Sequence, residues 1–334
     1  MRFFETVYSE KKVKLDMIDK KILFELSQNA REPYTVIAKR VGVSRDTVNY
    51  RINNLKKMGV LQGTRTLIDM SKFGYMTIHI LLQLKQPTKE SENELIKKLK
   101  QYPFLRAIIK FNGSYDFELA VVAKSMQECD DIIAKVSQDC AQFLQNYEVL
   151  FITKTLAANT FPKSFLDKEQ KQELVKHKTL DVDYKDVKIL EIVAEQADLP
   201  LYEIAGKIKL SSDAVQYRLK KLREQGVIIG YIPAINYSAI NYNVYAILLS
   251  VLDFSSVYEN KLKEFLRTNK DVLWGVKTIG KYNVMLYICT QNPDDLMKTT
   301  EQLRNLFVNN IRDYATLINF EEYKYTYFPK GLLS

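Results

Sequence analysis

The sequence has few of the residues that usually build metal or catalytic sites. Its 334 residues include 3 cysteines and 2 histidines, and no two cysteines are spaced as CxxC. Three cysteines cannot form a disulfide framework, and their spacing argues against a cysteine zinc site. The two histidines, His79 and His177, leave little room for histidine catalysis. We therefore expect no metal, no cofactor and no catalytic residue, and a protein that is not an enzyme.

Long apolar runs are also lacking. No run of about 18 apolar residues occurs, so we expect no membrane span and no membrane partner. The N-terminal segment is too charged for a secretory signal, and the low cysteine content fits a reducing compartment, so we expect a cytoplasmic protein. What the chain does have is basic charge: 49 Lys and Arg against 40 Asp and Glu give a net charge of +9. This charge permits a polyanionic partner.

The chain repeats itself. A shift of 167 residues aligns it with itself without a gap, placing Pro33 on Pro200 and Gly113 on Gly280. A period this long indicates a duplicated two-domain unit, because solenoid repeats have periods of about 20–50 residues. The pattern predicts a winged helix-turn-helix at 1–68, a ferredoxin-like domain at 69–166, a linker at 167–182, a second winged helix-turn-helix at 183–235 and a second ferredoxin-like domain at 236–334.

The first part of each half has a helical pattern. In half one, an apolar stripe over 22–26 and a short helix over 34–41 precede Ser44, a good N-cap for a third helix. The segment 60–68 alternates like a strand pair around Gly63. Three helices and a small β-wing are typical of a winged helix-turn-helix.

The second part of each half has the β-α-β-β-α-β order of a ferredoxin-like domain. The predicted elements are 76–84, 91–101, 105–111, 117–123, 126–143 and 147–155 in half one, and 244–252, 258–267, 272–279, 284–289, 296–308 and 315–325 in half two. The predicted fold class is therefore α+β, with two winged helix-turn-helix domains and two ferredoxin-like βαββαβ domains.

The third helix of each half carries side chains that can read DNA. Val48, Ile52 and Leu55 recur at helical spacing and must face the core, which turns the polar residues outward. Arg and Asn side chains can pair with base edges, and Lys and hydroxyl groups can hold phosphates. The predicted DNA contacts are Ser44, Arg45, Thr47, Asn49, Tyr50, Arg51, Asn53, Asn54, Lys57 and Arg65 in half one, and Ser211, Ser212, Gln216, Tyr217, Arg218, Lys220 and Lys221 in half two. The alternative is that these residues are only the solvated face of a helical domain.

The two halves differ in charge where DNA would bind. Residues 16–65 contain ten Lys and Arg against five Asp and Glu, whereas residues 183–232 contain eight of each. We expect unequal half-sites on the DNA, with the first reader dominating.

The segment "LDMIDKKILFELSQNAREPYTVIAKRVGVSRDTVNYRINNLKKMGVLQG", followed by a domain that carries "NGSYDFELAV", resembles the leucine-responsive regulatory protein (Lrp/AsnC) family of transcription regulators. Half two repeats both parts. The resemblance implies that the β domain dimerises and binds an amino-acid effector near the turn after its second strand. It places candidate effector residues at Gly113, Ser114, Tyr115 and Asp116, and at Gly280, Tyr282 and Asn283. Asn283 stands where half one has Asp116, which weakens a ligand amine contact in half two, and a plain hairpin turn explains the same residues.

The duplication predicts that the two β domains pair inside one polypeptide. The chain would then imitate the dimer of a single-copy relative and address double-stranded DNA at an imperfect palindrome. Further association into homo-oligomers is compatible with the resemblance.

Two other functions share this architecture. Sirohaem decarboxylases of haem biosynthesis have a similar two-domain plan, and their chemistry would require histidines and arginines around a tetrapyrrole. A ligand-sensing scaffold that does not bind DNA is the other alternative, although such scaffolds usually lose the helix-turn-helix that this chain has twice.

Overall fold

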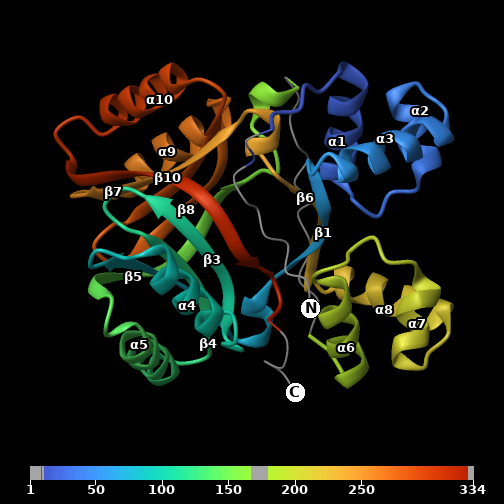
Figure 1. The fold of residues 1–334 in the computed structure, drawn as a ribbon, viewed down its shortest axis with the longest axis horizontal. Coiled ribbons are helices and arrows are strands. Elements are labelled where there is room, and N and C mark those ends of the chain that lie inside the picture. The colour runs from blue at the N-terminus through green and yellow to red at the C-terminus, as the bar shows by residue number, and fades with distance from the viewer. Residues whose placement is uncertain (1–8, 10, 167–179, 330–334) are drawn as a thin grey trace.

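The computed structural model describes residues 9, 11–166 and 180–329. The two helix-turn-helix units lie on one side and a β-barrel lies on the other, with a two-stranded ribbon between them (Figure 1). Within the described residues, no helix is long and apolar enough to cross a membrane. Most of the predicted linker, including His177, lies outside the described residues.

The two helix-turn-helix units are built by the same local signals. Their helices are α1 (Met17–Gln28), α2 (Tyr34–Val41) and α3 (Arg45–Lys57) in half one, and α6 (Tyr184–Val193), α7 (Leu201–Ile208) and α8 (Ser212–Glu224) in half two. Asp16 and Asp183 begin α1 and α6 with a capping box. A left-handed residue ends the second helix of each unit: Gly42 at φ 83° after α2 and Lys209 at φ 54° after α7.

The two ferredoxin-like domains close into one barrel. Its strand order is β10-β3-β4-β2-β5-β8-β9-β7. The strands are β2 (Met76–Leu84), β3 (Leu105–Asn112), β4 (Phe117–Ala123) and β5 (Leu144–Ala158) from half one, and β7 (Asn243–Val251), β8 (Val272–Ile279), β9 (Val284–Thr290) and β10 (Ile311–Tyr325) from half two. The last strand of each half joins the other half, because β5 pairs with β8 and β10 pairs with β3.

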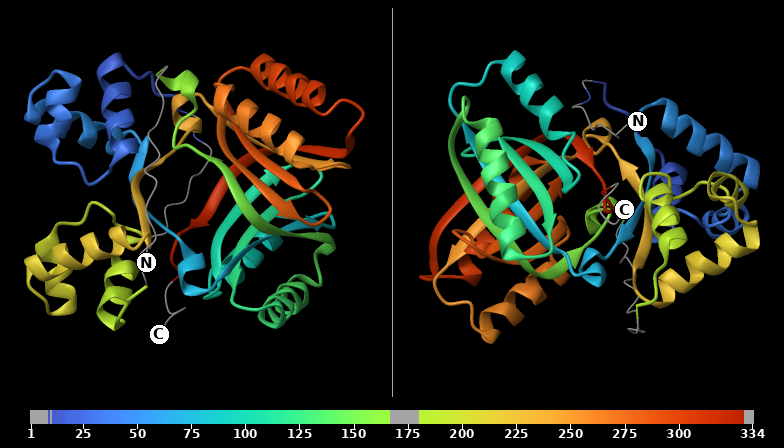
Figure 2. Two further views of the ribbon diagram at one scale, coloured as in Figure 1. Left: turned by 180° about the vertical axis from the view of Figure 1, so that it is seen from behind. Right: turned by 90° about the horizontal axis from the view of Figure 1, so that it is seen from below.

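The helices of the β domains cover the outside of the barrel (Figure 2). They are α4 (Lys89–Leu99) and α5 (Met126–Cys140) in half one, and α9 (Ser256–Thr268) and α10 (Pro293–Leu306) in half two; short 3₁₀ turns lie at Met70–Phe73, Lys163–Phe165 and Ser238–Ile240. Alternate strand residues therefore face two different cores. Ile78 and Ile80 pack outward with the helices of half one, whereas Leu81 joins the barrel interior with residues of both halves. The element order in each half is the predicted β-α-β-β-α-β, and the α+β fold class is confirmed.

The predicted wing is wrong in one respect. The segment 60–68 is not a hairpin around Gly63: it forms the single strand β1 (Leu61–Ile68), which pairs antiparallel with β6 (Ile228–Ile235) of the other half. An alternating pattern identifies a strand but not its partner. Each half thus contributes one strand to a shared ribbon that joins the two helix-turn-helix units.

Candidate nucleic-acid interface and ligand pocket

The third helix of each unit is held by its N-cap and by one buried face. Ser44 accepts a hydrogen bond from the Thr47 backbone N–H at 3.0 Å, and Ser211 accepts one from the Ala214 N–H at 3.2 Å. The inward-facing residues are fully or almost fully buried: Val48, Ile52 and Leu55 in α3, and Val215, Leu219 and Leu222 in α8. These contacts fix which sides of α3 and α8 remain uncovered.

The uncovered side of α3 presents most of the predicted polar residues. Arg45, Asn49 and Asn53 are exposed in a stripe at i, i+4 and i+8. The Asn53 amide donates to the Asn49 carbonyl oxygen at 3.3 Å, so the two amides lie side by side. Lys57 is exposed in the last turn, and Thr47 and Asn54 are partly buried beside the stripe.

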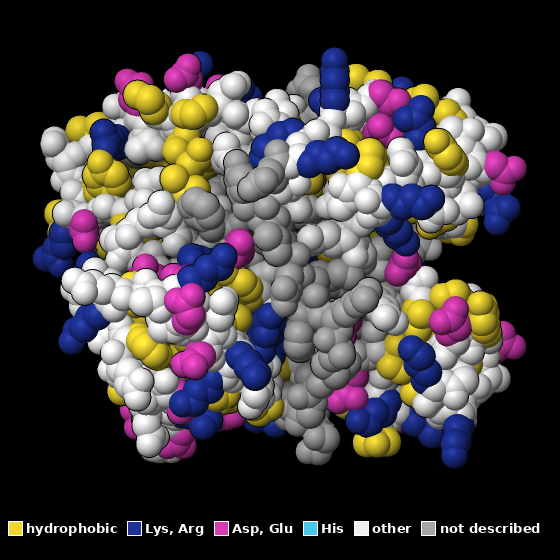
Figure 3. Space-filling model, viewed as in Figure 1, with side chains coloured by type: hydrophobic (Ala, Val, Ile, Leu, Met, Phe, Trp, Pro, Cys, Tyr) yellow, Lys and Arg dark blue, Asp and Glu magenta, His cyan; other side chains and the backbone are white. Residues whose placement is uncertain are grey.

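The uncovered side of α8 has a different composition at the same positions. Gln216 and Lys220 are exposed where half one has the two asparagines, and Ser212 takes the place of Arg45. Lys221 lies 2.7 Å from Asp181, and this hydrogen bond raises the pKa of the lysine. Figure 3 shows Lys and Arg side chains interspersed with acidic ones on the lobes that the two units form.

One aromatic residue is shared by both helices. Tyr50 is 67% exposed and Tyr217 is 70% exposed, and the 167-residue shift places one on the other. A large aromatic ring at this exposure is not needed for the core of the unit, so both rings are free for contact with a partner.

Arg51 and Arg218 form ion pairs within their own helix-turn-helix units. Arg51 lies 2.6 Å from Asp16 and 3.3 Å from Asp19, and the hydrogen bond to Asp16 is the main reason why the pKa of Arg51 is raised. Arg218 makes the equivalent pair with the capping box of α6. Each arginine therefore ties the third helix to the start of the first, and its charge is already balanced.

Arg65 is not available to DNA, which corrects the sequence prediction. Its side chain is 10% exposed and lies 3.3 Å from Glu322. Its guanidinium also stacks 4.7 Å from the centre of the Tyr325 ring. Because β1 pairs with β6 instead of folding into a wing, Arg65 faces the barrel and not the surface of the helix-turn-helix unit.

Hydrogen bonds join the two helix-turn-helix units to the shared ribbon and to each other. The Ala30 N–H donates to Tyr231, and at the equivalent place the Ala197 N–H donates to Thr64. The Arg31 guanidinium also donates to the Ala197 carbonyl. These bonds tie each unit to the ribbon strand of the other half, so the relative position of α3 and α8 is set within the chain.

The two predicted effector turns are pressed against the opposite half. A Cβ on Gly113 would lie 2.7 Å from Leu317 Cδ2, and one on Gly280 would lie 2.4 Å from the Val149 carbonyl oxygen. Their φ angles of 152° and 149° also favour glycine. Both glycines are therefore required by the close approach of the two halves.

The tyrosines in these turns are not surface ligand contacts. Tyr115 and Tyr282 are 3% and 2% exposed, and their rings meet edge to face at 6.4 Å. Burial is the main reason why the pKa of Tyr115 is raised. Both tyrosines of the predicted effector turns are therefore buried, and they pack one half on the other.

Asp116 and Asn283 close their own turns. The Asp116 carboxylate accepts from the Leu84 N–H at 2.7 Å. The Asn283 amide accepts from the Val251 N–H at 2.9 Å and donates to the Val251 carbonyl at 2.7 Å. The change from Asp to Asn therefore adds a bond to β7, the first strand of the barrel domain in half two.

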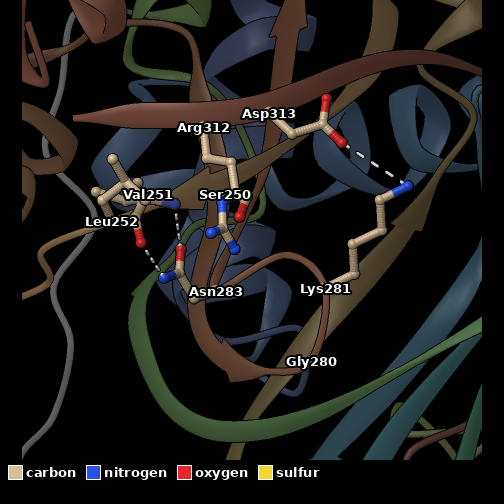
Figure 4. Close-up of a pocket in the computed structure, with 8 residues that line it drawn as sticks. All are labelled: Ser250, Val251, Leu252, Gly280, Lys281, Asn283, Arg312 and Asp313. Atoms are coloured by element: carbon tan, nitrogen blue, oxygen red, sulfur yellow. Dashed lines mark hydrogen bonds and ion pairs between the residues drawn. The ribbon is translucent and has the colours of Figure 1, made fainter. Parts of the chain in front are cut away.

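A polar pocket of about 450 Å³ opens beside the turn of half two (Figure 4). Lys281 lies 3.7 Å from Asp313, and Arg312 enters from the start of β10. The pocket is lined by Ser250, Val251, Leu252, Gly280, Lys281, Asn283, Arg312 and Asp313. Two cationic groups and one carboxylate in one hollow match the charges of a zwitterion.

The predicted effector turn of half two contains Lys281, between Gly280 and Tyr282, but the sequence prediction missed Arg312 and Asp313. The 167-residue shift places Lys281, Arg312 and Asp313 on Ser114, Gln145 and Asn146, which are neutral. Comparing the two copies at these positions would have revealed the site, because charged residues occur only in half two.

The fold and the exposed helices define a protein with two helix-turn-helix units in one chain. The winged helix-turn-helix DNA-binding family matches residues 15–62 and 182–229. The regulatory protein AsnC of Haemophilus influenzae is 31% identical over 120 residues, covering 36% of this chain and 79% of that protein. The HTH-type transcriptional regulator LrpA of Pyrococcus horikoshii is 32% identical over 120 residues, covering 36% and 84%. The chain belongs to the AsnC/Lrp family, in a tandemly duplicated form.

A solved structure also resembles nearly the whole chain. The siroheme decarboxylase NirDL superposes with a TM-score of 0.61 at 14% identity, covering 93% of this chain and 94% of that one. At this identity the likeness is one of fold.

Proposed function

We propose that this protein is a sequence-specific DNA-binding transcription regulator that reads an imperfect palindrome as a single-chain pseudo-dimer. The supporting observation is the pair of uncovered helices, α3 and α8, held in one arrangement by the β1–β6 ribbon. Pairing of β5 with β8 and of β10 with β3 supports the pseudo-dimer, because each half completes the sheet of the other.

The proposed base-reading residues occupy equivalent positions in the two helices. Arg45, Asn49 and Asn53 of α3 favour guanine and adenine, whereas Ser212, Gln216 and Lys220 of α8 form a more permissive set. Tyr50 and Tyr217 add a ring that can contact thymine methyl groups or donate to phosphate. Arg51, Arg218 and Arg65 are left out of this set because ion pairs within the fold hold them.

The unequal half-sites can be tested with matched alanine variants. Arg45→Ala removes a bidentate donor and should weaken specific binding about tenfold, whereas Ser212→Ala should change it less than about threefold. Lys97→Ala on α4 removes a similar charge from the barrel domain and is the control. Binding titrations at two salt concentrations measure the effects, and equal losses for Arg45→Ala and Ser212→Ala would contradict unequal half-sites.

The operator itself is found by retaining genomic fragments on the full chain at low ionic strength and sequencing what is retained. The proposal expects enrichment of fragments that share two related half-sites. If no duplex is retained, the DNA-binding function is wrong, and the alternative of a sensing scaffold without DNA binding takes its place.

We also propose that the half-two pocket binds an amino-acid effector. Lys281 and Arg312 can hold the carboxylate, and Asp313 can hold the ammonium group. Calorimetric titration of a panel of amino acids tests this, with Arg312→Ala expected to abolish binding. Gln145→Ala, the equivalent position of half one, is the control and should leave binding unchanged.

An enzymatic role on tetrapyrroles has no support from the described histidine. His79 is 6% exposed, lies inside the barrel and does not line the half-two pocket. A sirohaem titration distinguishes the functions: a coloured complex would favour the decarboxylase, and an unchanged spectrum would agree with the regulator.

A further inference from the structure

A polar cluster bridges the two halves inside the barrel. His79 on β2 and Glu118 on β4 belong to half one, and Trp274 on β8 and Tyr287 on β9 belong to half two. The Tyr287 hydroxyl donates to Glu118 Oε2 at 2.6 Å, and His79 Nδ1 lies 2.7 Å from Glu118 Oε1. Burial is the main reason why the pKa of Tyr287 is raised well above its usual value, which keeps its proton available for this bond.

Aromatic packing completes the cluster. The Trp274 indole stacks on His79 with ring centres 5.7 Å apart and an angle of 11° between the planes. Trp274 also lies 5.6 Å from the Tyr287 ring, which in turn lies 6.4 Å from Phe111. Glu118 is 1% exposed, so its carboxylate depends on these neighbours for its hydrogen bonds.

The 167-residue repeat has no second copy of this cluster. His79 corresponds to Ala246 and Glu118 corresponds to Met285, whereas Trp274 corresponds to Ala107 and Tyr287 corresponds to Ala120. All four counterparts are buried. Half one thus brings an acid, an imidazole and two alanines to the interior, and half two brings two aromatic rings, a methionine and an alanine.

We propose that this cluster makes the two halves selective for each other, so that half one pairs with half two and neither pairs with its own kind. The partner fitted by the inner face of half one is a face that offers a buried hydroxyl donor and two aromatic rings. A second copy of half one, or the β domain of a relative that lacks these groups, does not meet that requirement.

Pairing of two identical halves would fail for a different reason in each case. Two copies of half one would place Glu118 opposite Ala120, which leaves the buried Oε2 of Glu118 without its hydroxyl donor and the interior underfilled. Two copies of half two would bring four aromatic rings into the same space, and Tyr287 would face Met285 with its hydroxyl unbonded. Only the mixed pair satisfies the carboxylate and fills the interior.

The selectivity extends the proposed function, and its consequence for DNA rests on that function. If unlike halves always pair, every barrel presents one α3 and one α8, and the preferred operator is asymmetric. The cluster can be tested by stability alone, so a failure of DNA binding leaves the test intact.

The hydrogen bond at the centre is tested by a double-mutant cycle in the full chain. Glu118→Gln and Tyr287→Phe change the bonding groups with little change in volume. We expect each single substitution to raise the unfolding equilibrium constant at least fivefold. The double variant should raise this constant by a factor that is at least fivefold smaller than the product of the two single factors. If the factor for the double variant equals the product of the two single factors, the two groups are independent and the proposal is overturned.

The selectivity is tested by moving the contact to the other side of the pseudo-two-fold axis. Glu118→Met with Tyr287→Ala deletes the contact, and Ala120→Tyr with Met285→Glu adds a second one. Each pair should lower the midpoint of thermal unfolding, followed by the fluorescence of Trp274. The variant with all four substitutions restores one acid and one hydroxyl, and it should regain more than half of the summed loss. If the decrease in the midpoint for the fourfold variant equals the sum of the decreases for the two pairs, selectivity is contradicted. If the fourfold variant does not fold, the cycle of Glu118→Gln and Tyr287→Phe provides the test.

Discussion

The two helix-turn-helix units of this protein are alike in the contacts that build them and different at the exposed positions of their third helices. The capping boxes at Asp16 and Asp183, the serine caps of the third helices and the arginine that ties α3 or α8 to its capping box are repeated. The exposed positions of the third helices have diverged: Arg45 becomes Ser212 and Asn53 becomes Lys220. The comparison teaches that duplication preserved the scaffold while the two copies specialised on their surfaces.

The same contrast holds between the two ends of the barrel. Half two has a pocket with Lys281, Arg312 and Asp313, and half one has neutral residues at those positions. The barrel interior differs as well, with Glu118 in one half and Tyr287 in the other. A homodimer must use one sequence for both sides of its interface, whereas a fused pair can give each side its own role.

The largest expected effect is at the two glycine turns, where the halves approach each other closely. Gly280→Ala should destabilise the protein by about 3 kcal/mol or more, because the new Cβ meets the Val149 carbonyl oxygen in a backbone that cannot retreat. Gly113→Ala should cost less, about 2 kcal/mol, because its main contact is the movable end of the Leu317 side chain. Denaturant unfolding measures both, and a larger cost at Gly113 would contradict the geometry.

A second difference between the halves is a buried lysine near the end of β10. Lys324 donates to the carbonyls of Lys100 and Tyr102, and the equivalent residue of half one is Ala157. Burial lowers the pKa of Lys324 to about 8. The folded state therefore holds this proton less tightly than the unfolded chain, whose lysine titrates near about 10.4.

The sign of the pH effect follows from that shift. Stability is reduced while Lys324 must stay charged, below about pH 8, and it recovers as pH rises toward about 10.4. Lys324→Met should raise the unfolding free energy at pH 7 by up to about 3 kcal/mol. The difference in unfolding free energy between this variant and the unsubstituted protein should decrease as the pH rises from about 8 to about 10.4. Denaturant titrations of both proteins from pH 7 to 10.5 measure this, and a constant difference at every pH would contradict it.

The two arginines that pair with the capping boxes should differ in their contribution to stability. Arg218→Ala should destabilise the protein by about 2 kcal/mol, because it leaves the carboxylate of Asp186, which is 0% exposed, without its partner. Arg51→Ala should cost about 1 kcal/mol, because Asp19 remains slightly exposed. Arg40→Ala, which breaks an exposed pair with Glu25, is the control and should cost less than about 0.5 kcal/mol. Equal costs at Arg218 and Arg40 would show that the capping-box pairs are not structural.

The smallest expected effect concerns the charge at the ends of the reading helices. Lys57 of α3 corresponds to Glu224 of α8. Glu224→Lys should give half two a phosphate contact, strengthen DNA binding a few-fold and increase the salt slope by about 0.9. Lys57→Gln should do the reverse. A change in sequence preference without a change in slope would argue against a phosphate role.

Much of this architecture could be predicted from the sequence, because local signals specify it. Apolar periodicity located the helices and strands to within a few residues, and the 167-residue shift identified the duplication. The pairing of β1 with β6 could not be predicted, because it joins segments far apart in the chain. The burial of Arg65 follows from that pairing, and so the sequence placed it on a wing that the fold lacks.

Only the locally determined part of the candidate site could be predicted from the sequence. The exposed residues of α3 follow from its helical period once Val48 and Ile52 are assigned to the core. The pocket in half two depends on β10 passing beside the Gly280 turn, which no local pattern reveals. The roles of Tyr115 and Tyr282 likewise required the contact between the two halves.

The central claim is that one chain reads two half-sites. The most direct measurement is a tight-binding titration of the full chain against the genomic duplex that it retains, combined with a footprint on both strands. We expect a stoichiometry of one chain per duplex and protection of two unequal half-sites, with Arg45→Ala weakening protection at one of them. Two chains per duplex with equal protection, or no retention of any duplex at low ionic strength, would contradict it.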